Sequence, residues 1–128
     1  MCGRGSVLNR VVHFELLSRD PGAAASFYAD VFGWKTVRGE GDYYRLITGE
    51  EGDGTRGING AAVRPMLPSL PAQTVNTIHV KDLPAYAEKV RSRGGRTLSD
   101  VIPLAGVGRF QYCADPDGTP FGLIEYDD

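Results

Sequence analysis

The sequence of 128 residues contains little cysteine, methionine or tryptophan and has no long hydrophobic run. Its two cysteines, Cys2 and Cys113, lie far apart, which argues against a disulfide framework and favours a reducing compartment. No apolar stretch approaches the ~20 residues that a membrane-spanning helix needs, and the N-terminal residues lack an apolar run of signal-peptide length. We therefore expect a cytoplasmic protein with no membrane partner.

A charge excess of either sign is also missing. The formal net charge is −2, and charged residues make up 23% of the sequence. Because no basic excess is available to neutralise phosphates, we expect no nucleic-acid partner. The 41% hydrophobic content is that of a soluble globular protein and suffices for one domain over residues 1–128.

An internal repeat is present instead. A shift of 62 positions places His13 on Val75, Asp20 on Asp82 and Gly33 on Gly95. In each half, a β-type run is followed by an Asp suited to cap a helix, an Ala-containing segment with helical spacing and a terminating glycine. We read the helix residues Phe27, Tyr28 and Phe32 as core. The same order of elements in both halves predicts a duplicated module.

Three short β-type runs complete each half. The sequence predicts module one at about 11–65, a proline-rich connector at 65–72 and module two at about 73–127. The predicted strands are 11–18, 34–39, 42–48 and 57–64 in the first half, and 74–80, 96–102, 109–114 and 120–126 in the second. The pattern is βαβββ repeated once.

Two motifs then give the sequence a family resemblance. The segment DPGAAASFYADVFGW at 20–34 and the segment DPDGTPFGLIE at 115–125 resemble the vicinal oxygen chelate superfamily of glyoxalases, bleomycin-resistance proteins and dioxygenases. The resemblance extends from Val11 to Tyr126. It implies an α+β fold in which two βαβββ modules form a curved eight-stranded sheet around a cup, with the helices outside. It also implies a homodimer.

Catalytic members of this family hold a divalent metal in the cup, and the resemblance implies which positions would bind it. The first position is occupied by His13, the second falls at Gly60 or Ala61, the third at Val75 and the fourth at Gly122. Only His13 can ligate, so we expect no metal cofactor and no classical glyoxalase I activity. Glycine at 60 and 122 is expected to enlarge the cup.

A shifted metal site is the alternative. Strand periodicity places His13 and Glu15 on one face of their strand, and Thr77 and His79 on one face of the equivalent strand. If His13, Glu15 and His79 converge, two nitrogens and a carboxylate could hold Zn, Fe, Ni or Mn. Strand spacing of ~6.5–7 Å between alternate residues makes that convergence demanding.

We therefore predict a set of substrate-binding residues and assign no residue a catalytic role. Tyr43 and Tyr44 alternate across a strand, so one of them should face the cup, and Arg45 could neutralise an anionic ligand. The substrate-binding candidates are His13, Glu15, Tyr44, Thr77, His79 and Tyr112.

Three functions remain open at this point. The first is a metal-independent protein that binds a small organic molecule, which the lost ligands favour. The second is a lyase, isomerase or dioxygenase-type enzyme that uses a relocated metal or acid–base catalysis by His13 and Glu15. The third is a structural or regulatory module that acts through dimerisation.

Overall fold

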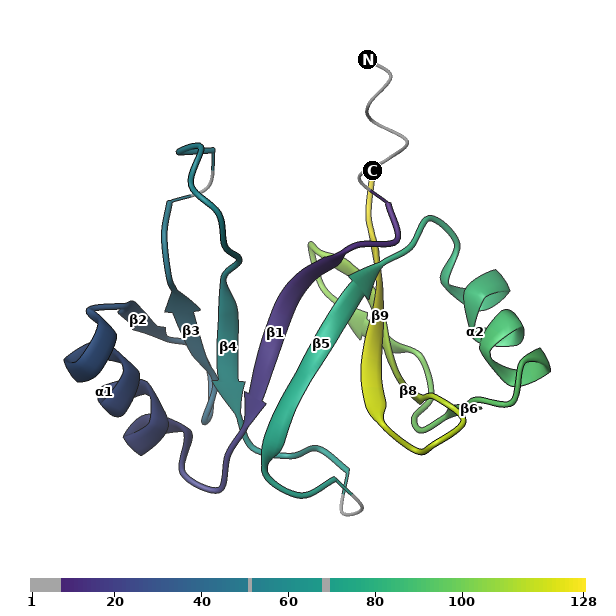
Figure 1. Ribbon diagram of the computed structural model, residues 1–128, viewed down its shortest axis with the longest axis horizontal. Helices are drawn as coiled ribbons and strands as arrows, with labels where there is room; N and C mark the ends of the chain where they lie inside the picture. The colour runs from purple at the N-terminus through teal and green to yellow at the C-terminus, as the bar shows by residue number, and fades with distance from the viewer. Residues whose placement is uncertain (1–7, 51, 68–69) are drawn as a thin grey trace. The chain divides into compact units, whose positions relative to one another are not determined.

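The computed structural model describes residues 8–50, 52–67 and 70–128, and its elements form two βαβββ modules (Figure 1). The first module contains β1 (Val11–Leu17), α1 (Pro21–Phe32), β2 (Lys35–Arg38), β3 (Tyr44–Ile47) and β4 (Gly60–Val63). The second contains β5 (Gln73–His79), α2 (Leu83–Ser92), β6 (Arg96–Thr97), β7 (Ile102–Leu104), β8 (Gly108–Ala114) and β9 (Pro120–Tyr126). The described chain divides into two compact units: one contains residues 13–75, and the other contains residues 8–12 together with residues 76–128.

The duplication predicted from the sequence is confirmed by the element boundaries. The 62-residue shift carries the limits of β1 onto those of β5 and the first residue of α1 onto that of α2. Asp20 and Asp82 cap the two helices: their carboxylates accept hydrogen bonds from the backbone N–H of Ala23 and Ala85 at 3.0 and 3.2 Å. Gly33 ends α1 in the left-handed conformation that glycine adopts without strain.

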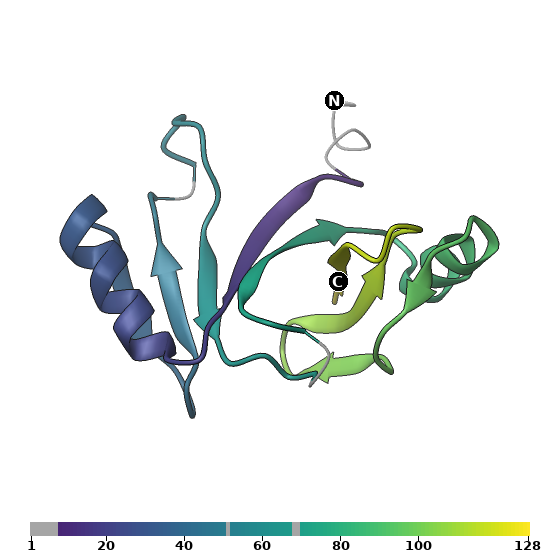
Figure 2. The ribbon, with the colours of Figure 1, turned by 60° about the horizontal axis from the view of Figure 1, so that its bottom comes forward.

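The first module has a four-stranded mixed sheet with α1 on one side (Figure 2). Its strand order is β2-β3-β4-β1, with β1 parallel to β4 and the other neighbours antiparallel. Ala25 of α1 packs on Leu46 and Ala62 of the sheet, and Phe14 and Trp34 border this cluster. This packing defines a helix-facing side of the sheet and leaves the opposite side without a helix of this module.

The second module repeats the arrangement. Its strand order is β5-β9-β8-β6, and β7 also pairs with β8. Leu83 of α2 packs on Val80, Cys113 and Leu123. The Cys113 thiol is fully buried, and burial raises its pKa to about 11, so it is an apolar core residue. Cys2 lies outside the described residues.

The expected strand 96–102 is interrupted, so the described residues contain nine strands rather than eight. Between β6 and β7, the Ser99 hydroxyl accepts a hydrogen bond from the Tyr112 N–H at 3.0 Å, and the Ser99 carbonyl accepts one from Gln111 Nε2 at 2.8 Å. Side-chain groups thus replace part of the strand pairing along β8.

The core assignment of α1 is wrong for two of its three aromatic residues. Phe27 and Phe32 are 55% and 60% exposed, whereas Tyr28 stacks on Trp34 with 5.0 Å between ring centroids. An apolar residue at helical spacing need not face the sheet, because α1 is apolar around most of its circumference. Neither helix in the described part of the chain is long and apolar enough to cross a membrane.

Candidate functional site

Polar side chains gather on the side of the first module's sheet that faces away from α1. Glu15 of β1 pairs with Ala61 of β4, and Ala61 pairs with Arg45 of β3. Residues in one such row point to the same side of a sheet, and side chains two positions along a strand share that side. His13 therefore lies beside Glu15, and Tyr43 lies beside Arg45. We call the surface formed by His13, Glu15, Tyr43, Arg45 and Ala61 the His13 face.

The electrostatics of these groups support that arrangement. Burial lowers the pKa of His13, and the nearby charge of Arg45 lowers it further. Burial raises the pKa of Tyr43, as does the negative charge of Glu15, while Arg45 acts in the opposite direction. The His13 imidazole is thus held neutral near pH 7, next to a permanent cation.

Tyr44, the tyrosine selected from the sequence, lies on the other side of this sheet. It packs at the border of the cluster formed by Ala25, Leu46 and Ala62. A methyl group on Gly22 of α1 would come within 3.1 Å of its hydroxyl oxygen. Tyr43 rather than Tyr44 shares the His13 face, because the register of β3 directs odd-numbered residues away from α1. This corrects the choice between the two tyrosines.

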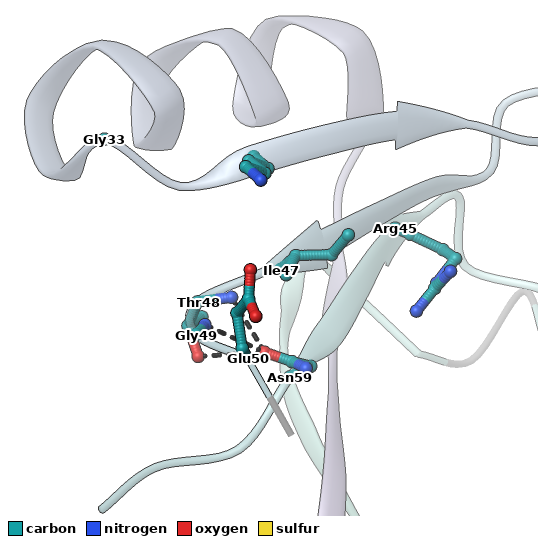
Figure 3. A pocket seen from close by; sticks show the side chains of 8 residues that line it. Gly33, Arg45, Ile47, Thr48, Gly49, Glu50 and Asn59 are labelled. Carbon is teal, nitrogen blue, oxygen red and sulfur yellow. Dashed lines mark hydrogen bonds between the residues drawn. The ribbon is translucent and has the colours of Figure 1, made fainter. Parts of the chain in front are cut away.

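A cavity of about 450 Å³ adjoins this face within the first module (Figure 3). Lys35 of β2 and Arg45 and Ile47 of β3 line it, together with Asn59 and the segment after β3. Lys35 pairs with Ile47, so these side chains project from the same side of the sheet as Glu15. The cavity is within the size range typical of small-molecule sites.

The second module brings its three predicted residues onto one face. Thr77 of β5 and Tyr112 of β8 flank Gly122 of β9 in one row, and His79 follows two positions after Thr77. Thr77 and Tyr112 are each only 1% exposed. The His79 ring lies 4.8 Å from that of Tyr126, a contact that packs it against a neighbouring aromatic residue.

Phe110 alters the expected role of Gly122. A methyl group at Gly122 would come within 2.5 Å of the Phe110 ring, which crosses the ring of Tyr112 nearly at right angles. The space expected to enlarge the ligand site is therefore occupied by this ring. Gly60 enlarges nothing either, because a side chain there would point at Phe14 on the helix-facing side. The expectation of an enlarged cup was wrong at both glycines.

The residues at the family's metal-binding positions do not fit a divalent cation. Ala61, Val75 and Gly122 carry no donor atom, and Gly122 is covered by Phe110. His13 alone cannot complete a site that needs three or four donors. Across the described ranges, no three His, Cys, Asp or Glu side chains form a group suited to a metal.

Two residues of the first-module site are signalled in the sequence. Alternation along the strand places Tyr43 on the same side as Arg45. Lys35 directly follows Trp34 at the start of a predicted strand. It lies two positions before Val37, which pairs with Arg45, so Lys35 lies on the same side of the sheet as Arg45. Asn59 precedes β4 in a glycine-rich segment and carries no such signal.

Comparison with known sequences agrees with the family resemblance of the two motifs. The family model described as "Glyoxalase/Bleomycin resistance protein/Dioxygenase superfamily" matches residues 10–123. Curated relatives named "Putative glyoxylase CFP32", from Mycobacterium bovis and Mycobacterium tuberculosis, are 32% identical over 120 residues. The alignment covers 85% of this chain but only 42% of either relative, so this chain spans less than half of their length.

Solved structures share the fold at lower identity. Methylmalonyl-CoA epimerase from M. tuberculosis has a TM-score of 0.65 at 19% identity, covering 92% of this chain and 88% of its own. A Streptomyces coelicolor methylmalonyl-CoA epimerase variant in complex with 2-nitronate-propionyl-CoA has a TM-score of 0.69 at 18% identity, covering 94% and 99%. The match of the family model over residues 10–123 shows that the chain belongs to the glyoxalase/bleomycin resistance protein/dioxygenase superfamily, and the duplicated βαβββ modules agree with it.

Proposed function

We propose that this chain binds a small organic molecule on the His13 face, without a divalent metal held at the family's usual positions. The observation that carries the proposal is the convergence of His13, Glu15, Tyr43 and Arg45 on a side of the sheet that this module's helix does not cover. A few polar groups on a mostly apolar scaffold are typical of ligand sites. The adjoining cavity provides the volume for a ligand.

Loss of the metal changes what the face can recognise. A metal-binding site orients a substrate through two neighbouring oxygens, whereas His13 and Arg45 offer hydrogen bonds and one fixed positive charge. Tyr43 adds an aromatic ring suited to an organic ligand. We infer a binding or sequestering role as the primary function.

A thermal-shift screen of organic compounds tests this proposal, because a ligand that binds the folded state raises its melting temperature. We expect stabilising compounds whose effect is strongly reduced by His13→Ala and Glu15→Ala. Lys81→Gln, an exposed substitution in the second module, is the control and should leave the effect unchanged. Full retention of binding by both first-module variants would refute the His13 face as the site.

Proton transfer is a second candidate function, favoured by the neutral state of His13. An unprotonated imidazole next to a carboxylate is able to accept a proton from an acidic C–H bond. Structural neighbours named as epimerases belong to the isomerase class that this chemistry serves. Deuterium incorporation from D2O into a bound compound, lost in His13→Ala, would establish the activity. Binding without exchange would leave the sequestering role.

A homodimer is the remaining proposal, and its support is the family resemblance. Symmetric dimers are the commonest oligomers of soluble proteins. Light scattering coupled to size exclusion gives the mass in solution. We expect twice the chain mass of 13.8 kDa, and a value equal to the chain mass would contradict the dimer.

A further inference from the structure

The cavity beside the His13 face has an unusual charge balance. Lys35 and Arg45 both line it, and Glu50 is the carboxylate among its lining residues. The ion pairs formed within residues 8–50, 52–67 and 70–128 are Arg64–Asp42, Arg91–Glu88 and Arg109–Glu125. Neither Lys35 nor Arg45 is therefore bound to a carboxylate of a described residue. Among the described lining residues, two side chains are cationic and one is anionic, and the Asp53 carboxylate lies 3.8 Å from the position that a Gly49 side chain would occupy.

Hydrogen bonds fix the polar rim of this cavity. The Asn59 side-chain oxygen accepts hydrogen bonds from the Thr48 N–H at 2.8 Å and the Gly49 N–H at 3.2 Å, while the Thr48 hydroxyl donates to the Ile58 carbonyl at 2.6 Å. The two backbone donors determine which end of the Asn59 amide is the oxygen. The amide nitrogen, a donor only, is consequently left on the side of Arg45, as Figure 3 shows.

At this rim, Lys35 and Arg45 are cations and the Asn59 amide nitrogen is a hydrogen-bond donor, and all three attract negatively charged oxygens. An arginine fork and a lysine ammonium both bind carboxylate and phosphate oxygens, and an amide N–H adds a directed hydrogen bond. Glu50 opposes any anion, so it limits how much negative charge the cavity can accept. A ligand carrying an acidic group fits these charges better than a neutral or cationic ligand.

We propose that this cavity binds the acidic group, a carboxylate or a phosphate, of a small organic ligand. The inference rests on the proposed function and deepens it, since Arg45 belongs both to the cavity and to the His13 face. The acidic group occupies the space between Lys35, Arg45 and Asn59, and the rest of the ligand extends toward His13. The substrate class is then an organic acid or a phosphate ester.

Nuclear magnetic resonance titration of the full chain with malonate, inorganic phosphate and neutral malonamide tests the proposal. We expect malonate or phosphate, but not malonamide, to shift the backbone amide signals of Lys35, Thr48, Gly49 and Asn59. Lys35→Gln should weaken the anion's affinity by about 3- to 10-fold, as expected for one charge removed near a partly hydrated site. Malonate and phosphate distinguish a carboxylate from a phosphate preference.

The negative charge of Glu50 provides a second test of the proposal. Glu50→Gln removes repulsion and should strengthen anion binding by about 2- to 5-fold. Lys81→Gln in the second module is the matched control for loss of one positive charge and should change nothing. A role of Lys35 and Glu50 in folding alone would not produce effects of opposite sign, and dispersed amide spectra check that every variant is folded.

Equal shifts with malonate and malonamide, or equal affinities in Lys35→Gln, Glu50→Gln and the control, would overturn the inference. Its failure is distinguishable from failure of the proposed function. If screened compounds depend on His13 while malonate affinity ignores Lys35, the acidic-group inference alone is wrong. If the charge variants behave as expected but no compound depends on His13, the proposed use of the His13 face is wrong.

Discussion

Arg45 is the residue at which the electrostatics of the first module converge. It lowers the pKa of His13, reduces the rise in the pKa of Tyr43 and lines the adjoining cavity. An arginine guanidinium is a fixed positive charge in proteins. The protonation state of His13 is therefore set by two separable causes, burial and a neighbouring cation.

Replacing Arg45 separates these causes. Arg45→Gln should raise the pKa of His13 without returning it to its ordinary value, since burial is the larger cause of the decrease. The titration of the His13 imidazole signals by NMR measures the change. An unchanged or lower midpoint in the variant would show that Arg45 does not act on His13.

The lowered pKa of His13 also predicts a pH dependence of stability. Below the unfolded-state pKa of about 6.5, the unfolded chain binds a proton that the folded chain resists, so the free energy of unfolding falls as the pH falls. The loss should begin near pH 6.5 and stop below the folded-state pKa of His13. Urea unfolding at several pH values should show a weaker dependence in His13→Gln, and an identical dependence in that variant would contradict the assignment.

At the scale of elements, the two helices of the repeat differ on their outer surfaces. The 62-residue shift places Phe27 and Val31 of α1 on Lys89 and Arg93 of the second half. Phe27 and Val31 are each 55% exposed. The fold therefore does not require apolar residues at these positions, whereas Tyr28 is needed where it stacks on Trp34.

Substitutions on α1 should reveal this difference. Phe27→Lys should change the free energy of unfolding by no more than about 1 kcal/mol, because it removes an exposed ring that contacts Tyr28 at its edge. Tyr28→Ala should cost about 2–4 kcal/mol through lost packing. Chemical denaturation measures both values, and a larger cost for Phe27→Lys would mean that Phe27 is buried in solution.

The pairing of β8 with β9 depends on the absence of a side chain at Gly122. Gly122→Ala brings a methyl group into the Phe110 ring and should destabilise the fold by about 1–3 kcal/mol. In a Phe110→Leu background the same substitution should cost clearly less, because the colliding ring is gone. Strictly additive costs in this double-mutant cycle would show that the ring and the glycine are not in contact.

At the scale of the whole molecule, the repeat made most of the fold predictable. Capping aspartates, terminating glycines and alternating strands are local signals, and they placed both helices and the order of the modules. The split between β6 and β7 was missed because Ser99 replaces strand pairing through its own hydroxyl. The side of Tyr44 was missed because sequence alternation gives two faces without saying which one meets the helix.

The candidate site was less predictable than the fold for the same reason. His13 and Glu15 followed from one strand, but the contributions of Tyr43 and Lys35 depend on the register between strands. Asn59 accepts a hydrogen bond from the Thr48 N–H, and Phe110 covers Gly122. Both contacts are made across the sheet, so no local sequence pattern predicts them. The ligand roles of Thr77, His79 and Tyr112, and the cytoplasmic location, stay predictions.

We propose that this member of the superfamily binds its ligand through the side chains of the His13 face, without a divalent metal at the family's metal-binding positions. Elemental analysis of the chain, purified without chelators, tests that claim most directly. We predict far less than one zinc, iron, nickel or manganese ion per folded chain. One tightly held ion per chain, lost on substitution of His13, would contradict the claim.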